Sequence, residues 1–157
     1  MGIDMETKGL IETLARGVCL MDGRILLCRS RKAGNVYLPG GHIEFGETGA
    51  EALVREIREE MGCRSRVSGF LGCAEHRFRQ KGRPHAEINL VYLLKVAGLA
   101  PDVPPPCRED WIEFYWHPLS RLGATGLEPA ALRRLLPRWL AAAPADNLAT
   151  TRARFHP

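Results

Sequence analysis

The stretch that decides the fold is GHIEFGETGAEALVREIREEMGC, residues 41–63. Thr48 followed three residues later by Glu51 is typical of a capping box, and Gly62 suits the position just past a helix end. The sequence therefore predicts a helix from about Gly49 to Met61. Apolar residues recur within it at helical spacing and should form one stripe that faces a core. These residues are Ala50, Leu53, Val54, Ile57 and Met61.

Three carboxylates occupy a second face of the same helix. Glu56, Glu59 and Glu60 stand at positions i, i+3 and i+4, so all three side chains can reach one point. Like charges at i,i+4 cost ~0.2–0.5 kcal/mol per pair, and more where burial lowers the dielectric. Protonation of one carboxyl would relieve the repulsion, but a hard divalent cation does so better. Oxygen-only ligands favour Mg²⁺, Mn²⁺ or Ca²⁺ over zinc.

Two further features point to the same place. Arg55 lies one turn from Glu51 and Glu59, and the turn before the helix brings Glu47 to the same end, which predicts a structural ion pair. The segment 38–41, Leu-Pro-Gly-Gly, reads as a strand that runs into a sharp turn. Its glycines allow positive φ, so a carbonyl such as that of Gly40 could turn inward as another oxygen ligand.

Taken alone, the acidic face is most simply explained as the solvated side of a surface helix. The spacing of the whole segment makes a different interpretation stronger, because it resembles closely the signature of the Nudix hydrolases. The positions that carry the resemblance are Gly41, Glu47, Arg55, Glu56, Ile57, Glu59, Glu60 and Gly62. Cys63 is a soft departure, since the family prefers Ile, Leu or Val there, and cysteine is a small hydrophobe.

The resemblance implies an α/β fold, the Nudix-type α/β/α sandwich with a mixed central sheet. It also implies a Mg²⁺-dependent pyrophosphohydrolase, with Mn²⁺ as the alternative cofactor, that cleaves a nucleoside diphosphate linked to another group. Residues that match Glu56, Glu59 and Glu60 bind metal in the family, and the carbonyl that matches Gly40 often joins them. Catalysis is assigned to Glu56, Glu59 and Arg55. Water attack on phosphorus needs a proton acceptor, for which Glu56 is the first choice.

The composition suits one domain of this kind. The chain has 157 residues, 45% of them hydrophobic and 25% charged, which is enough for a single core. We predict one domain over residues 1–142 and a loose C-terminal tail over 143–157. No apolar run approaches the ~20 residues of a membrane span, so a cytoplasmic protein with no membrane partner is expected. Five cysteines without Cys-x-x-Cys spacing are expected to be reduced thiols.

Turn signals and periodicity predict the remaining elements. Asp22-Gly23 between apolar runs predicts a hairpin, and the polar stretch 80–84 predicts a loop between two longer strands. The predicted strands are 16–20, 24–28, 36–38, 66–77, 86–96 and 111–116, with a Pro-rich loop over 97–110. A final helix should open at Glu128-Pro129 and be kinked or ended by Pro137.

Residues outside the signature must select the substrate. The candidates are Arg29, Phe78, Glu109 and Asp110. Arg29 could reach a phosphate and Phe78 could stack on a base, although a lone aromatic on a strand more often belongs to a core. Glu109 or Asp110 lies where relatives often carry a further carboxylate, and a solvated loop acid is an equal alternative. No proline stands at the downstream spacing associated with ADP-ribose pyrophosphatases, which leaves a nucleoside triphosphate or related nucleotide as the default.

Two alternatives remain open from the sequence. The first is an enzyme that acts on RNA 5′ ends, which needs a continuous basic groove with exposed aromatics. The arginines are scattered in the sequence and form no such stripe, although folding could assemble one. The second is a catalytically silent nucleotide-binding Nudix module, against which the intact Arg55-Glu56 and Glu59-Glu60 argue. A homodimer is also compatible with the sequence.

Overall fold

The computed structural model describes residues 9–142 and 147–151, which form two four-stranded sheets. The first sheet has the strand order β5-β1-β7-β6, and in the second β3 pairs with β2, β4 and β8. The strands are β1 Ile11–Val18, β2 Leu20–Met21, β3 Arg24–Ser30, β4 Val36–Tyr37, β5 Gly40–His42, β6 Ser65–Gln80, β7 Arg83–Val96 and β8 Ile112–Pro118. The predicted loose tail lies largely outside the described residues, and its residues 147–151 have no helix or strand.

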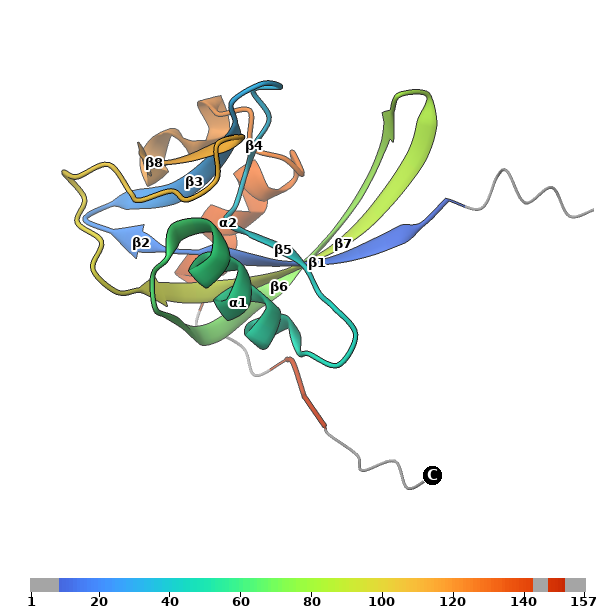
Figure 1. The fold of residues 1–157 in the computed structure, drawn as a ribbon, viewed down its shortest axis with the longest axis horizontal. Coiled ribbons are helices and arrows are strands. Elements are labelled where there is room, and N and C mark those ends of the chain that lie inside the picture. Colours follow the sequence, from blue (N-terminus) through green and yellow to red (C-terminus); the bar gives the residue numbers. More distant parts are fainter. Residues whose placement is uncertain (1–8, 143–146, 152–157) are drawn as a thin grey trace, which may run out of the picture.

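The first sheet is mixed, as predicted. β1 runs parallel to β7, whereas β5 and β6 are antiparallel to their neighbours. The helices α1 (Gly49–Met61) and α2 (Leu132–Ala141) cover opposite faces of the strands (Figure 1). Side chains alternate accordingly along β3, because successive residues of a strand point to opposite faces. Leu26 and Cys28 enter the core under α1, and Ile25 and Leu27 enter the core under α2. The α/β sandwich is therefore confirmed.

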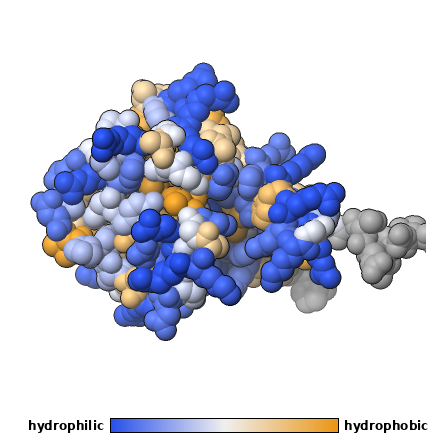
Figure 2. All heavy atoms as spheres, turned by 90° about the horizontal axis from the view of Figure 1, so that it is seen from above, coloured by the Kyte–Doolittle hydropathy of each residue, from blue (hydrophilic) through white to orange (hydrophobic). Residues whose placement is uncertain are grey.

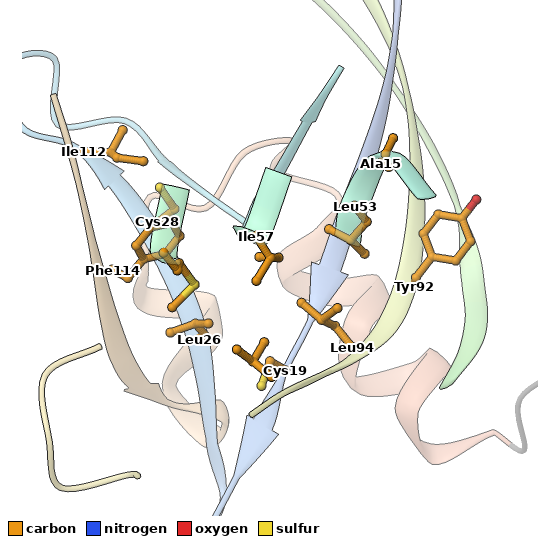
Figure 3. Close-up of a cluster of buried hydrophobic side chains, with 13 residues drawn as sticks. Ala15, Cys19, Leu26, Cys28, Leu53, Ile57, Tyr92, Leu94, Ile112 and Phe114 are labelled. Atoms are coloured by element: carbon orange, nitrogen blue, oxygen red, sulfur yellow. The ribbon is translucent and has the colours of Figure 1, made fainter. Parts of the chain in front are cut away.

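The core under α1 holds the signature helix in place. Leu53 and Ile57 of the helix are fully buried and project toward Leu26 of β3 and Leu94 of β7 (Figure 3). The capping box is present: the Thr48 N–H donates to Glu51 Oε2 at 2.8 Å, and the Glu51 N–H donates to Thr48 Oγ1 at 3.2 Å. Gly62 ends the helix with a left-handed φ of 72°. The bounds predicted for this helix are confirmed.

The predicted hairpin at Asp22-Gly23 is confirmed, but its first strand is divided between the sheets. Both turn residues have positive φ, 47° and 71°, as a two-residue hairpin turn requires. β1 begins at Ile11 rather than Arg16, and β2 starts at Leu20 in the other sheet. All five cysteines are free thiols, as expected.

The polar stretch 80–84 is not the loop that was predicted. β6 extends to Gln80 and β7 starts at Arg83, so the connection is only Lys81-Gly82, with φ of 50° and 77°. Pro84 lies inside β7, although proline cannot donate to a ladder. It is tolerated there because β1 pairs with β7 only as far as Ala86, which leaves Pro84 on an open edge.

The final helix also differs from the prediction. It begins at Leu132, three residues after Pro129, and the turn before it is closed by a hydrogen bond from the Leu132 N–H to the Pro129 carbonyl at 2.9 Å. It runs through Pro137 to Ala141 rather than ending there. Leu136, before the proline, is fully buried, and Trp139, after it, packs against Gly72 of β6. Tertiary packing on both sides thus outweighs the backbone hydrogen bond that proline removes.

Within residues 9–142 and 147–151, no helix has the length and hydropathy needed to cross a membrane.

We expect Leu136→Ala to lower the free energy of unfolding by about 2–5 kcal/mol, because it opens a cavity beneath α2. Urea unfolding monitored by circular dichroism measures this. Arg134→Ala on the exposed side of the same helix is the matched control and should stay within about 0.5 kcal/mol of wild type. Equal losses in the two variants would contradict the assigned packing of α2.

Candidate active site

The acidic face of α1 lies against the short strand β5. The sequence predicts a sharp turn at Gly40-Gly41, but these residues form a strand that pairs antiparallel with β1. Gly40 has a φ of 131°, and a Cβ there would overlap the Ala15 carbonyl oxygen. A Cβ at Gly41 would overlap the Glu56 carboxylate. The two glycines therefore let the backbone of β5 approach both β1 and the helix.

Arg55 joins the loop before the helix to the acidic face. Its guanidinium donates two hydrogen bonds to Glu47, at 2.7 and 3.1 Å, and a third to the His42 carbonyl at 3.0 Å. Its Nη1 lies 3.2 Å from both Glu56 Oε1 and Glu59 Oε2. The ion pair predicted between Arg55 and Glu47 is therefore present, and the same cation also engages two of the three proposed metal ligands.

Glu47 is fixed on its other side by the loop itself. Its Oε1 accepts a hydrogen bond from the Glu44 N–H at 2.9 Å. The bidentate contact with Arg55 lowers the pKa of Glu47 below its ordinary value, and the Glu44 N–H adds to this effect. The loop between β5 and α1 is thus held as a charged, hydrogen-bonded turn.

Glu60 is the buried member of the acidic face, with 9% of its surface exposed. Burial raises the pKa of its carboxyl to about 8; the negative charge of Glu56 acts in the same direction, and Arg16 opposes it. No hydrogen bond or ion pair among the described residues involves this carboxylate. Glu60 is therefore an acid at which added positive charge would be strongly stabilising.

Arg16, which the sequence reasoning missed, stands beneath this site. Its guanidinium donates to the Gly40 carbonyl at 3.1 Å and the Leu38 carbonyl at 3.2 Å, and it lies 5.3 Å from the ring centre of Tyr37. Asn89, fully buried on β7, accepts a further hydrogen bond from it at 3.4 Å. Burial lowers the pKa of Arg16. The available signal was an arginine at the first position of the predicted strand 16–20, which is otherwise free of charged residues.

The donor set suits a hard divalent cation. It consists of carboxylates and a backbone carbonyl, which are the ligands that Mg²⁺ and Mn²⁺ take. Glu56 and Glu59 lie close to the buried Glu60, and a bound cation would neutralise the negative charge of these carboxylates. Within the described residues, however, no three acidic, histidine or cysteine side chains are already placed to hold an ion, and Glu56 and Glu59 instead accept hydrogen bonds from Arg55.

Of the two candidate loop acids, Glu109 lies nearer to the site. The Arg108 N–H donates to the Glu60 carbonyl at 2.7 Å, which fixes this loop on the end of α1. The charge of Glu109 contributes to the raised pKa of Glu60, and its carboxylate accepts a hydrogen bond from Trp111 at 3.3 Å. Asp110 is exposed.

The other two substrate candidates lie away from α1. Arg29 pairs with Glu113 of β8, and its guanidinium lies 5.0 Å from the ring centre of Tyr115. Phe78 stands near the far end of β6, stacked between the imidazoles of His76 and His85. None of these contacts joins either residue to the acidic face.

Comparison with known proteins matches this architecture to one family. Residues 12–139 match the NUDIX domain. The chain is 40% identical over 85 residues to an ADP-ribose pyrophosphatase of Methanocaldococcus jannaschii, covering 52% of this chain and 49% of that protein. It is 29% identical over 128 residues to an isopentenyl-diphosphate Delta-isomerase of Cereibacter sphaeroides, covering 76% and 71%.

Solved structures show the same likeness. A MutT NUDIX hydrolase from Burkholderia pseudomallei superposes with a TM-score of 0.60 at 26% identity, covering 71% of this chain and 85% of that one. The chain spans about half the length of the archaeal pyrophosphatase, and the isomerase, matched over more of its length, is named for a different reaction.

We expect Arg55→Gln to return the pKa of Glu47 toward the ordinary value of about 4.3, because the bidentate contact is lost. Carboxyl ¹³C titration by NMR measures it. When folding lowers the pKa of a carboxyl, ionisation of that carboxyl stabilises the folded protein at pH values above its unfolded-state pKa. This stabilisation is lost as the pH falls through the folded-state pKa. The wild type should therefore lose stability more steeply than Arg55→Gln below about pH 4.3.

Arg58→Gln is the matched control, since Arg58 is an exposed arginine on the same helix. It should leave the Glu47 titration where it is in the wild type. An unchanged Glu47 midpoint in Arg55→Gln would show that the pairing does not set this pKa.

Proposed function

The chain belongs to the Nudix family, and from this we propose that it hydrolyses a pyrophosphate bond in a nucleoside diphosphate linked to another group. The observation that carries the proposal is the packing of the acidic face of α1 on β5, with Glu60 buried and Arg55 holding Glu56 and Glu59. A surface helix with only a solvated acidic face would have no reason to bury one of its carboxylates, which costs free energy unless an opposite charge compensates.

Mg²⁺, or Mn²⁺ in its place, is the proposed cofactor. Glu56, Glu59 and Glu60 would hold it, with the carbonyl of Gly40 as a further ligand. That carbonyl already accepts a hydrogen bond from Arg16, and its second lone pair remains for an ion. A bound divalent cation neutralises phosphate charge and lowers the pKa of water.

The protein residues have separate roles in this proposal. Glu56 accepts the proton of the attacking water at a carboxylate oxygen, and Arg55 and Gly41 on either side limit where that oxygen can lie. Arg55 acts with Glu59 in positioning the acidic face. Arg16 positions the Gly40 carbonyl and supplies a buried positive charge beneath the site.

The substrate is proposed to be a nucleoside triphosphate or a related nucleotide. The chain is similar to proteins named ADP-ribose pyrophosphatase and isopentenyl-diphosphate isomerase, so ADP-ribose and isopentenyl diphosphate must both be tested as substrates. The panel is therefore nucleoside triphosphates, ADP-ribose, nucleotide sugars, dinucleoside polyphosphates, 5′-triphosphorylated RNA and isopentenyl diphosphate, each with Mg²⁺ and with product identification. Reaction in ¹⁸O-labelled water identifies the phosphorus that is attacked. Isomerisation without phosphate release would contradict the proposal, as would no turnover of any substrate.

We expect Glu59→Gln and Glu60→Gln each to remove most Mg²⁺-dependent hydrolysis, because each deletes one negative ligand. Both should also reduce the rise in melting temperature that Mg²⁺ gives the wild type, since a ligand stabilises only the form that binds it. Circular dichroism should show an intact fold.

Glu75→Gln, at an exposed acid on β6, is the matched control and should keep wild-type activity and the wild-type response to Mg²⁺. Full activity in both Glu59→Gln and Glu60→Gln would rule out the proposed site.

A further inference from the structure

The hairpin of β6 and β7 extends beyond the rest of the sheet. β1 pairs with β7 as far as the register Ile11–Ala86, and beyond it β6 and β7 pair only with each other, down to Gln80–Arg83. Figure 1 shows this part as a curved two-stranded arm that leaves the body of the molecule. We define the hairpin arm as residues 76–86.

The hairpin arm carries a net positive charge, although Glu75 and Glu87 directly flank it in the sequence. It contains four basic residues and no acidic one, and the whole chain has a formal net charge of only +4. All four are exposed: Arg77, Arg79, Lys81 and Arg83. Across residues 9–142 and 147–151, no ion pair involves any of them. In Figure 2 hydrophilic side chains dominate this end of the molecule, with a small apolar area among them.

One face of the arm combines arginines with an apolar floor. Arg77 and Arg79 stand two residues apart on β6, opposite Ala86 and Pro84 of β7, so the four side chains share a face. Together with Ile11 they line a shallow hollow. Such a surface can hold a phosphate between the guanidinium groups while the sugar or base rests on the apolar side chains.

The opposite face carries three stacked rings. The ring centre of Phe78 lies 5.0 Å from those of His76 and His85, with interplanar angles of 24° and 9°. The stack is half-buried rather than part of either core. Two acids lie beside it: Glu12 is engaged by His42 at 2.9 Å and by His85 at 3.7 Å, and Glu87, which is paired with His76, accepts a hydrogen bond from Asn89 at 3.4 Å. Outer faces of such a stack can accept a nucleic-acid base.

The same strand leads from the arm to the candidate active site. Along β7, His85 is followed on the same face by Glu87 and Asn89. Asn89 bonds Arg16, which in turn bonds the carbonyl of Gly40. The face of the arm that carries the rings is therefore connected to the Gly40 carbonyl through Asn89 and Arg16, and the carboxylate of Glu87 lies between the rings and Asn89.

We propose that the hairpin arm binds single-stranded nucleic acid, with phosphates on its four cations and bases on its stacked rings. Exposed cations combined with aromatic platforms are what single-strand binding surfaces use, whereas an acidic protein would need the cations but not the stack. A two-stranded arm with cations on both faces lets a flexible single strand curve around it, which a stiff duplex cannot do. This surface does not depend on the proposed hydrolysis, because binding needs neither Mg²⁺ nor the carboxylates of α1.

The test is fluorescence anisotropy of the full chain with a labelled oligouridylate of about twelve nucleotides, in EDTA, over a series of salt concentrations. Counterion release from a single strand gives a slope of ~0.7 per neutralised phosphate. Four cations therefore predict a slope of log K against log salt between about −2 and −2.8. Poly-glutamate and a duplex of equal length serve as competitors and should compete poorly.

Arg77→Glu/Arg79→Glu should weaken binding at least about tenfold and make the slope shallower by about 1.4. The matched control is Arg64→Glu/Arg66→Glu, which makes the same charge change at exposed positions near the start of β6, at the other end of the hairpin. It should change the affinity by less than about twofold, because global charge alone acts weakly at a distance. Equal weakening in the two double variants would overturn the assignment of the arm.

Phe78→Leu separates stacking from charge. It removes the central ring but no cation, so it should weaken binding at least about fivefold while the salt slope stays that of the wild type. All variants lie outside both cores and should keep the wild-type melting temperature. Competition by poly-glutamate as strong as that by unlabelled oligouridylate would also overturn the proposal and indicate a site for acidic protein instead.

Discussion

One guanidinium determines the arrangement of the candidate site. Arg55 has five N–H donors in a rigid plane, and it directs them at Glu47, Glu56, Glu59 and the carbonyl of His42. These partners come from the loop, the helix and β5, so a single side chain fixes all three relative to one another. A lysine could not replace it, because one ammonium cannot span carboxylates on two sides of a plane. Arg55 thus positions these three elements, and it also lowers the repulsion between two carboxylates.

The charges beneath the helix are balanced by a second arginine. Glu60 is buried and its pKa is raised, while Arg16 is buried and its pKa is lowered, and each opposes the shift of the other. Arg16 donates its hydrogen bonds to the carbonyls of Leu38 and Gly40 and to the side chain of Asn89, and not to Glu60. The acid is therefore stabilised only through space, and a cation arriving at the site meets a carboxylate that no hydrogen bond among the described residues restrains.

The sequence predicted best where local chemistry decides the structure. The capping box and Gly62 delimited α1 correctly, and Asp22-Gly23 located the hairpin, because both are short-range backbone effects. It predicted worst where distant residues decide. Pro84 within a strand and Pro137 within a helix violate local propensity, and only an open sheet edge and the packing of α2 permit them. For the same reason the sequence missed Arg16, whose importance comes from partners 22 to 73 residues away.

The β6–β7 hairpin differs from the other strands because it extends beyond the hydrophobic cores. If the hairpin served only to complete the sheet, it could stop at the first residue of β1, where Ile11 pairs with Ala86. The pairs beyond it bury little apolar surface and add four cations that form no ion pair with any residue the structure describes, and their mutual repulsion opposes folding. Folding stability therefore gives no reason for this arm, whereas an anionic partner does. β7 is continuous from the arm to Asn89, which accepts a hydrogen bond from Arg16, so a nucleic acid long enough to contact both the arm and the candidate site would be held at two points.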